Sequence, residues 1–526
     1  MTGVIVAGMH RSGTSLLTSF LDSGGWHCGE EQLSTPTENY REDASFVALH
    51  RSWLDAILPP GFGHHDWGIS SAGVVELPVT DEDKRAMAIS VADFVALRNH
   101  ERPRWVAKDP RASLFLPVWL EQSELKFVFV YRNPWDVLDS AMRLSFGPFC
   151  AQPQLVLGAW LDYNRRIIDA ITRFPKRCSL IASEMLLFDP AQVWNELGNF
   201  VGMHGAASDA LVDSEKYVHR DDNSAIAQVY RDIYPQHVEL LARLDLLAKV
   251  GRSNATPIWA SGRKSHTPPR HGGTLPVGTG VQVIIPCRND GQFLAEAIAS
   301  VDDCANGRVE LTIIDDGSTD TETLRIMAAL SASGRDVIMA PAQGLASARN
   351  TAAAKSRTAA VLPLDSDNRL RIPLIRALDL IENGTTDIVH GPWRQFGMQS
   401  QIVTPPSMTM DNLVPHNTID ACALISRVLL DQLGGWDEGL RFYEDWDLWL
   451  GAVRQGARST CLDRTTFDYL VRPGSLSNTA ADNRLEYESV IARITIKHES
   501  LLGPTVSRLV REIHCLSAAR HKENRA

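Results

Sequence analysis

Residues 8–15 of this chain read Gly8-Met9-His10-Arg11-Ser12-Gly13-Thr14-Ser15. They follow the apolar run Val4 to Ala7 and precede apolar residues that recur at helical spacing. This order predicts a strand, a glycine-rich loop and a helix. In such a loop successive backbone N–H groups converge on a phosphate, and the helix dipole adds to the attraction for the anion. We therefore expect a phosphate site at the start of the chain.

The loop departs from the pattern of nucleotide hydrolases. It fits G-x-x-x-x-G, but Thr14 stands where such a loop carries lysine. The basic residue, Arg11, instead precedes the second glycine. This displacement favours a phosphate-bearing donor other than ATP.

Length and composition indicate a multidomain globular enzyme. A chain of 526 residues is long enough for about three domains. No apolar run of the length of a membrane span appears, and no basic or apolar leader precedes the first strand. We expect a cytoplasmic protein without a transmembrane segment. The net charge of −11 argues against nucleic-acid binding, and eight scattered cysteines without a C-x-x-C pair are typical of reduced thiols.

A Gly- and Pro-rich stretch divides the chain. The segment 261–280 is too polar and too rich in Gly and Pro to build a core, so it predicts an interdomain linker. Apolar runs alternate with helical patterns on both sides of it, which predicts two α/β domains with parallel sheets. The expected division is 1–256, a linker at 257–280, 281–480 and a helical segment at 481–526. That last segment is compatible with a helical subdomain, a docking arm or a partly ordered tail.

A second phosphate motif follows the apolar strand 126–131. It reads Arg132-Asn133-Pro134-Trp135-Asp136-Val137-Leu138-Asp139-Ser140. Pro134 suits the first turn of a helix, so Arg132 at the strand end and Ser140 on the helix point to the same side. A guanidinium and a hydroxyl that converge there predict a second phosphate site, separate from the loop.

Together the two motifs resemble those of sulfotransferases that use 3′-phosphoadenosine 5′-phosphosulfate (PAPS). The resemblance covers about residues 1–250 and includes a family-like stretch at 183–190. It implies a P-loop-like fold in which Arg132 and Ser140 bind the 3′ phosphate. It also implies that the 5′ phosphosulfate lies on Arg11, Ser12, Gly13, Thr14 and Ser15.

Sulfuryl transfer requires a cation beside the leaving oxygen and a base for the acceptor hydroxyl. Arg11 occupies the family's catalytic basic position. Lys108, which follows another short strand, is a candidate second cation, and a salt bridge with Asp109 or a neighbour is an equally good interpretation of it.

The motifs identify the base for the acceptor hydroxyl less directly than the cation. Glu42 matches a glutamate that relatives with this loop carry, although the surrounding aromatic and glycine positions differ. We favour Glu42 over Glu38, with His64 or His65 as further alternatives. His10 is better interpreted as a residue that shapes the loop.

The half beyond the linker carries a different set of motifs. The strand 283–285 leads into Pro286-Cys287-Arg288, the next ends in Asp315-Asp316-Gly317-Ser318, and a later one ends in Asp365-Ser366-Asp367. Two carboxylates one residue apart at a strand end can hold a hard divalent cation and leave positions open for a diphosphate. Further on come Gly434-Gly435-Trp436-Asp437-Glu438 and Glu444-Asp445-Trp446-Asp447-Leu448-Trp449.

These motifs resemble the inverting family-2 glycosyltransferases of GT-A fold over about residues 280–475. The resemblance implies a nucleotide-sugar donor, Mn²⁺ or Mg²⁺ on Asp365 and Asp367, and Asp445 as the catalytic base. It also implies donor contacts from Pro286, Arg288, Asp316, Arg349 and Asp365. Asp445 also suits a helix N-terminus, where the dipole favours a carboxylate; Trp446 and Trp449, which suit stacking on a sugar, favour the catalytic interpretation.

The leading hypothesis is therefore a bifunctional transferase that sulfates and glycosylates the same glycan or glycoconjugate. If that acceptor is a lipid, we expect peripheral membrane association; the oligomeric state is open. Two alternatives remain at this point. The first half could be a P-loop kinase or NTPase, or a degenerate sulfotransferase fold that only binds.

Overall fold

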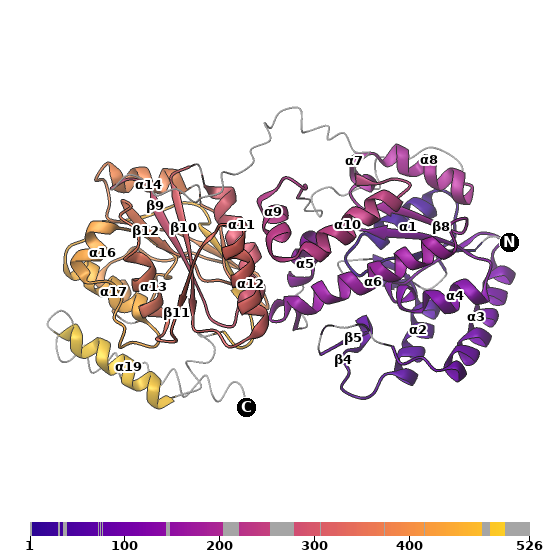
Figure 1. The fold of residues 1–526 in the computed structure, drawn as a ribbon, viewed down its shortest axis with the longest axis horizontal. Helices are drawn as coiled ribbons and strands as arrows, with labels where there is room; N and C mark the ends of the chain where they lie inside the picture. The colour runs from indigo at the N-terminus through magenta and orange to yellow at the C-terminus, as the bar shows by residue number, and fades with distance from the viewer. Residues whose placement is uncertain are drawn as a thin grey trace. The chain divides into compact units, whose positions relative to one another are not determined.

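The computed structural model describes residues 3–29, 32–34, 39–71, 73, 75, 77–143, 148–203, 220–252, 278–305, 307–372, 374–414, 416–475 and 484–499. Contacts divide the chain into two compact units. The first comprises Met1–Ala141, Gln152–Asp221 and Tyr234–His266, and the second comprises Met142–Ala151, Asp222–Ile233 and Thr267–Ala526. Figure 1 shows the helices and strands of both units.

The first unit is built on a four-stranded parallel sheet in the order β6-β1-β7-β8. Its strands are β1 (Gly3–Ala7), β6 (Trp105–Lys108), β7 (Lys126–Tyr131) and β8 (Cys178–Ala182). These strands are almost wholly buried, as expected of a parallel sheet whose faces are covered by helices. Short antiparallel pairs are formed by β2 (Gln32–Ser34) with β3 (Asn39–Asp43) and by β4 (Gly63–His64) with β5 (Ile69–Ser70).

Helices surround this sheet (Figure 1). They are α1 (Thr14–Ser23), α2 (Ala44–Ile57), α3 (Asp81–Glu101), α4 (Leu116–Gln122), α5 (Pro134–Met142), α6 (Pro153–Arg173), α7 (Met185–Phe188), α8 (Pro190–Val201) and α10 (Pro235–Leu247). Two 3₁₀ turns, η1 (His65–Trp67) and η2 (Pro110–Phe115), matter for the site described below.

The second unit has a seven-stranded mixed sheet in the order β11-β10-β9-β12-β17-β14-β18. Its strands are β9 (Val281–Cys287), β10 (Val309–Asp316), β11 (Asp336–Ala340), β12 (Ala360–Pro363), β14 (Ile388–His390), β17 (Leu424–Ser426) and β18 (Ser459–Cys461). Strands β9 to β12 are mutually parallel, and β17 runs antiparallel between β12 and β14. A second sheet has the order β13-β19-β15-β16 and consists of β13 (Arg369–Leu370), β15 (Trp393–Gly397), β16 (Ile402–Val403) and β19 (Phe467–Val471).

The helices of this unit include one from before the linker. They are α9 (Ala225–Ile233), α11 (Leu294–Cys304), α12 (Thr321–Ala332), α13 (Leu345–Ala353), α14 (Leu374–Glu382), α15 (Met410–Leu413), α16 (Arg427–Leu433), α17 (Glu444–Arg454) and α19 (Arg484–Lys497). Helix α9 contacts α11 and α12, and Arg325 of α12 donates a hydrogen bond to the carbonyl of Ile233 at 2.9 Å.

The α/β class predicted for both halves is confirmed. The apolar runs at 4–7, 126–131, 281–285 and 309–314 lie in β1, β7, β9 and β10. Residues 253–277, which include most of the predicted linker at 257–280, lie outside the described residues, so the domain boundaries stay predictions. Within the described part of the chain, no helix combines the length and the apolar character that crossing a membrane requires.

Helix α9 provides a test of how the second unit is built. Ile226 is buried on α9, so Ile226→Ala should destabilise this unit by about 2–4 kcal/mol. Hydrogen exchange of the α11 amides should accelerate accordingly. Ile89→Ala, at an exposed position of α3, is the control and should leave α11 unchanged. Unaltered α11 protection in Ile226→Ala would show that α9 does not support this helix.

Candidate functional sites

The phosphate loop lies between β1 and α1, as the sequence predicts. Gly13 precedes α1 with a φ of 95°, a conformation that side chains disfavour. A Cβ at Gly8 would lie 2.4 Å from the carbonyl oxygen of Val130. No side chain of the described residues caps α1, and the buried hydroxyl of Ser12 has no partner among them. The Ser12 hydroxyl is therefore available to an anion at this helix N-terminus.

The two phosphate motifs, which the sequence predicts as separate sites, contact each other in the structure. Nε of Arg11 donates a hydrogen bond to Oγ of Ser140 at 3.0 Å. Nη1 of Arg132 donates to the carbonyl oxygen of Arg11 at 3.4 Å. Arg132 and Ser140 are both buried, whereas Arg11 is half-exposed. Residues 129 positions apart thus form one electropositive corner at the carboxyl ends of β1 and β7.

Lys108 and Glu42 form an ion pair. Nζ of Lys108 lies 2.8 Å from Oε1 of Glu42, and a guanidinium nitrogen of Arg111 lies 3.6 Å from Oε2. Burial lowers the pKa of Lys108 although Glu42 opposes this effect. Of the two interpretations of Lys108, the structure shows the salt bridge, and its partner is the proposed base. A base held in this way has a fixed orientation.

Asp109 is occupied by other partners. It accepts a hydrogen bond from His50 at 2.8 Å and another from Nε of Arg111 at 3.1 Å. Because the indole of Trp119 donates to Nε2 of His50 at 2.9 Å, the proton of a neutral His50 lies on Nδ1 and faces Asp109. Burial alone would raise the pKa of Asp109, but Arg111 and His50 hold it at about 2.

The remaining base candidates are placed as follows. Glu38 lies outside the described residues. His65 lies 3.5 Å from Asp55, and partial burial lowers the pKa of His64. His10 stacks on Trp67 with ring centroids 4.4 Å apart, and burial and Arg111 hold its pKa well below the usual value. These contacts are those of a neutral residue that packs the loop.

In the second unit, Asp316 at the end of β10 binds the backbone. Its two carboxylate oxygens accept hydrogen bonds from the N–H groups of Gln343 and Gly344 at 2.9–3.1 Å. Pro286 lies within β9 and Arg288 is exposed just beyond it. These residues lie at the carboxyl ends of parallel strands, where open α/β sheets bind ligands.

Arg349 on α13 joins two of the predicted site elements. Its guanidinium donates to Oδ1 of Asp365 at 2.8 Å and to Oε1 of Glu444 at 2.5 Å. The side chain is fully buried, and its pKa is raised by Asp365 and Glu444 against the effect of burial. The strand end that carries the D-x-D motif and the start of α17 are therefore tied together by one cation.

A second arginine holds the other aspartate of this motif. Arg472, just after β19, donates to Asp367 at 2.8 Å and to Asp290 at 2.7 Å. Its guanidinium lies over the ring of Phe293, 4.5 Å from the centroid. Burial raises the pKa of Asp367 to about 6, although Arg472 opposes this effect.

Asp445 lies in the first turn of α17. It accepts a hydrogen bond from the side-chain amide of Asn417 at 2.8 Å and one from the N–H of Trp446 at 2.8 Å. Burial and the neighbouring Asp420 raise its pKa, and burial raises that of Asp420 to about 7. A carboxylate with a raised pKa is a stronger base than an exposed one.

The expectation that Trp446 and Trp449 stack on a sugar is wrong. Both side chains are about 1% exposed, and their indole N–H groups donate to the carbonyls of Leu413 and Ile419. They belong to the apolar core of this unit, since α17 turns one face inward. Trp436, for which a core role was equally plausible, is also buried.

The carboxylates fit the predicted divalent cation. Asp365 and Asp367 each use one oxygen on an arginine, and acidic neighbours outnumber the cations around them. Among the described residues no group of three His, Cys, Asp or Glu side chains could hold a metal. Mg²⁺ and related ions commonly take one or two carboxylates and complete their shell with substrate phosphates and water. Asp365 and Asp367 would thus hold the ion only together with a diphosphate.

Comparison with known families agrees with this geometry. Residues 3–206 match the model "Sulfotransferase family", and residues 282–434 match "Glycosyl transferase family 2". The chain carries a sulfotransferase domain and a family 2 glycosyl transferase domain. The suspected fusion is confirmed at the level of these two families.

Individual proteins that resemble this chain share less than a third of its residues in the aligned regions. The "Succinoglycan biosynthesis protein ExoU" of Rhizobium meliloti is 29% identical in an alignment of 227 residues that covers 39% of this chain and 66% of that protein. The chain thus spans about two thirds of the length of this relative. Among solved structures, Staphylococcus aureus TarS 1–349 in complex with UDP-GlcNAc is 20% identical over 44% of this chain and 70% of that chain, with a TM-score of 0.37. The mannosyltransferase PcManGT from Pyrobaculum calidifontis in complex with GDP-Man and Mn²⁺ is 14% identical over 57% of this chain and 85% of that chain, with a TM-score of 0.34.

Sequence reasoning missed several residues of both sites. Arg111 is three residues after Lys108, and Glu444 directly precedes Asp445. Their closeness to these predicted site residues is a signal by which they could have been identified. Asp420 and Arg472 stand in no motif that we recognised. Their roles appear only when distant segments meet.

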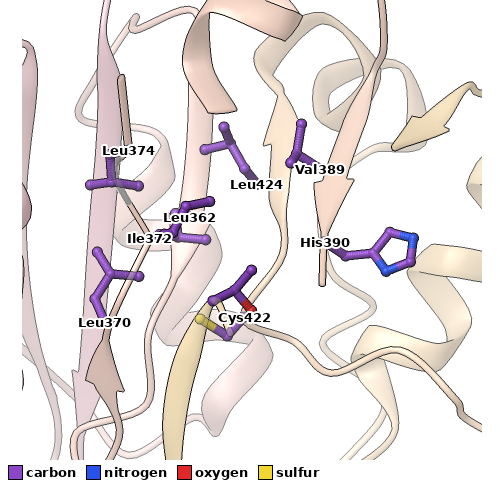
Figure 2. A pocket seen from close by; sticks show the side chains of 9 residues that line it. Leu362, Leu370, Ile372, Leu374, Val389, His390, Cys422 and Leu424 are labelled. Carbon is purple, nitrogen blue, oxygen red and sulfur yellow. The ribbon is translucent and has the colours of Figure 1, made fainter. Parts of the chain in front are cut away.

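The glycosyl transferase domain also encloses a small internal cavity. Figure 2 shows its leucine and isoleucine side chains gathered together, with the imidazole of His390 extending away from them. About 10 Å³ is open to the centre of a water molecule, which is room for roughly one water. Both ring nitrogens of His390 lack a partner among the described residues. The cavity is part of the core and too small for a substrate.

His390 should make this domain sensitive to acid. Burial lowers its pKa to about 4, against about 6.5 in an unfolded chain. The unfolded state therefore binds more protons between these values, and stability is lost as the pH falls from 6.5 to 4, by up to about 3 kcal/mol. We expect His390→Gln to lose less stability than the wild type over this range in urea unfolding.

Buried carboxyls such as Asp420 act in the opposite direction, because their raised pKa stabilises the fold at low pH. Both proteins share these groups, so the difference between them isolates His390. Parallel stability curves for the two proteins would rule out this role.

Proposed function

We propose that this protein is a bifunctional transferase of glycan assembly. Its sulfotransferase domain would transfer a sulfuryl group from PAPS to a hydroxyl of a glycan or glycoconjugate. Its glycosyl transferase domain would add a sugar from a nucleotide-sugar donor. The observation that carries the first activity is the meeting of Arg11, Ser140 and Arg132 at the phosphate loop. The second is supported by the connection of Asp365 to the start of α17 through Arg349.

In the proposed sulfuryl transfer, the acceptor oxygen attacks sulfur and the bond from sulfur to the bridging oxygen of the nucleotide breaks. The electron pair stays on the leaving nucleotide, where the Arg11 guanidinium stabilises the growing charge. Glu42 takes the acceptor proton. Lys108 and Arg111 orient this carboxylate, and Arg132 with Ser140 would hold the 3′ phosphate.

In the proposed glycosyl transfer, the acceptor oxygen attacks the anomeric carbon and the bond to the diphosphate breaks. Asp445 takes the proton from the acceptor hydroxyl, and direct displacement inverts the configuration. Mn²⁺ or Mg²⁺ held by Asp365 and Asp367 would supply positive charge for the departing diphosphate. Asn417 orients the Asp445 carboxylate.

The setting of these reactions follows from the same proposal. PAPS and nucleotide sugars are cytoplasmic donors in this scheme, so both domains would act in the cytoplasm. A lipid-linked acceptor would bring the protein to a membrane surface without a spanning segment.

The sulfotransferase assignment is tested with the product nucleotide PAP. We expect PAP to raise the melting temperature of the wild type, and Arg132→Ala to weaken PAP binding by about 10- to 100-fold, because a charged hydrogen bond to phosphate is lost. Calorimetric titration gives the affinity. Arg165→Ala, which removes an exposed arginine paired with Asp162, is the matched control.

Three results would point elsewhere. No PAP response at millimolar concentration would refute the assignment. ATP turnover without PAPS use would favour the kinase or NTPase alternative. Good PAP binding without sulfation of any acceptor in a cell extract would favour a binding module.

The base assignment in the glycosyl transferase domain predicts a pH effect. Asp445→Asn should lower the rate of nucleoside diphosphate release from UDP- and GDP-sugars by at least about 100-fold, with nucleotide binding retained. Because burial and Asp420 raise the pKa of Asp445, the wild-type rate should fall with decreasing pH already above the usual range of a carboxyl group.

Asp463→Asn, at an exposed carboxylate, is the control and should behave as the wild type. A wild-type rate in Asp445→Asn would assign the base to another residue. A rate that is independent of pH between 4 and 7 would contradict the raised pKa.

A further inference from the structure

The end of helix α19 contacts the helix that carries the proposed base. Nζ of Lys497 lies 2.6 Å from Oδ2 of Asp447, and Nε2 of His498 lies 2.9 Å from Oδ1. Asp447 and His498 are both buried. Asp447 stands two residues after Asp445 in the first turn of α17, so its two carboxylate oxygens are held by Lys497 at the end of α19 and by His498, the residue that follows α19.

Lys497 also reaches a second motif. Its Nζ lies 3.1 Å from Asp437 in the Gly434–Glu438 motif, and Arg493 of α19 lies 2.8 Å from the same carboxylate. Burial alone would lower the pKa of Lys497, but Asp447 and Asp437 raise it. One charged ammonium thus bridges the turn before α17 and the first turn of α17 itself.

A strained residue lies between these two contacts. Tyr443 precedes α17 with a φ of 63°, a left-handed conformation that costs a residue with a side chain of order 1–3 kcal/mol and persists only when its surroundings hold it. The hydroxyls of Tyr443 and Tyr487 of α19 are 3.5 Å apart. Tyr487 also stacks with Phe442 at a centroid distance of 6.1 Å. Helix α19 therefore packs on the strained turn that leads directly into Glu444 and Asp445.

We propose that α19, together with His498 directly after it, is a positioning element of the glycosyl transferase domain, in which Lys497, His498 and Tyr487 hold the first turn of α17 so that Asp445 faces the acceptor hydroxyl. This inference rests on the proposed glycosyl transfer. The three residues act through α17 and touch no reacting atom. Without Lys497, the buried Asp447 loses a charge partner, and such a loss disturbs the local structure strongly.

The test compares three variants of the full-length protein. Lys497→Met should lower kcat for nucleoside diphosphate release from UDP- or GDP-sugars at least 10-fold and leave the donor KM within about twofold. Lys497→Arg should recover at least half of the wild-type kcat. Arg441→Gln, which breaks an exposed pair with Glu486 of α19, is the matched control and should behave as the wild type.

Hydrogen exchange gives a readout that does not depend on turnover. The amides of Glu444–Trp449 should exchange at least 10-fold faster in Lys497→Met, while binding of the nucleoside diphosphate stays unchanged and shows that the second unit is folded. Wild-type kcat in Lys497→Met, or unchanged protection of these amides, would overturn the inference. A parallel loss of nucleotide binding and kcat would also overturn it, since that result indicates unfolding. If the wild type neither binds nucleotide nor releases it from donor sugars, the proposed function itself fails, while amide protection still reports the contact between α19 and α17.

Discussion

The buried guanidinium of Arg349 is the constraint on which the glycosyl transferase site depends. A charge in the interior is tolerated only when its hydrogen-bonding capacity is met by well-placed partners. Arg349 meets this condition with Asp365 from the end of β12 and Glu444 from the start of α17. The two segments lie about 80 residues apart in the sequence, and neither can move without leaving a charge unpaired. Arg349 thereby ties the position of Asp365 to that of the helix start that carries the proposed base.

The sulfotransferase domain uses arginine in the same way. Arg111 contacts Asp109, Glu42 and Asp66, and these carboxylates come from three different segments. Glu42 stands on β3, outside the parallel sheet, so its own strand does not fix its distance from β6. The ion pairs with Lys108 and Arg111 do so. In both domains the backbone brings the motifs to one edge of a sheet, and buried cations determine which carboxylate oxygens remain available there.

A feature of the structure could be predicted from the sequence when the residues that form it are close together in the chain. The phosphate loop, the helix after Pro134 and the strand ends at Asp316 and Asp365 depend on contiguous residues, so the sequence predicts them correctly. The pairs Lys108–Glu42 and Arg472–Asp367 are 66 and 105 residues apart, and no local pattern specifies them. Trp446 and Trp449 were assigned wrongly because an aromatic residue beside a catalytic motif can face a ligand or the core. The two residues are three positions apart, so they share one face of the helix, but this spacing does not show whether that face packs on the core or contacts a ligand. The contribution of α9 to the second unit was missed because α9 precedes the predicted linker and its sequence contains no motif that assigns it to the second unit.

Electrostatics also explains why the glycosyl transferase domain needs a segment after its last sheet strand. The first turn of α17 contains Glu444, Asp445 and Asp447. The positive end of the helix dipole favours acidic residues there, but three carboxylates at one helix start repel one another. Arg349 forms an ion pair with Glu444, Lys497 forms one with Asp447, and Nε2 of His498 lies 2.9 Å from the other carboxylate oxygen of Asp447. Asp445 is left with neutral donors, the Asn417 amide and a backbone N–H. Arg349 and Lys497 thus pair with the two flanking carboxylates, whereas Asp445 accepts hydrogen bonds from neutral donors and has a pKa that burial and Asp420 raise.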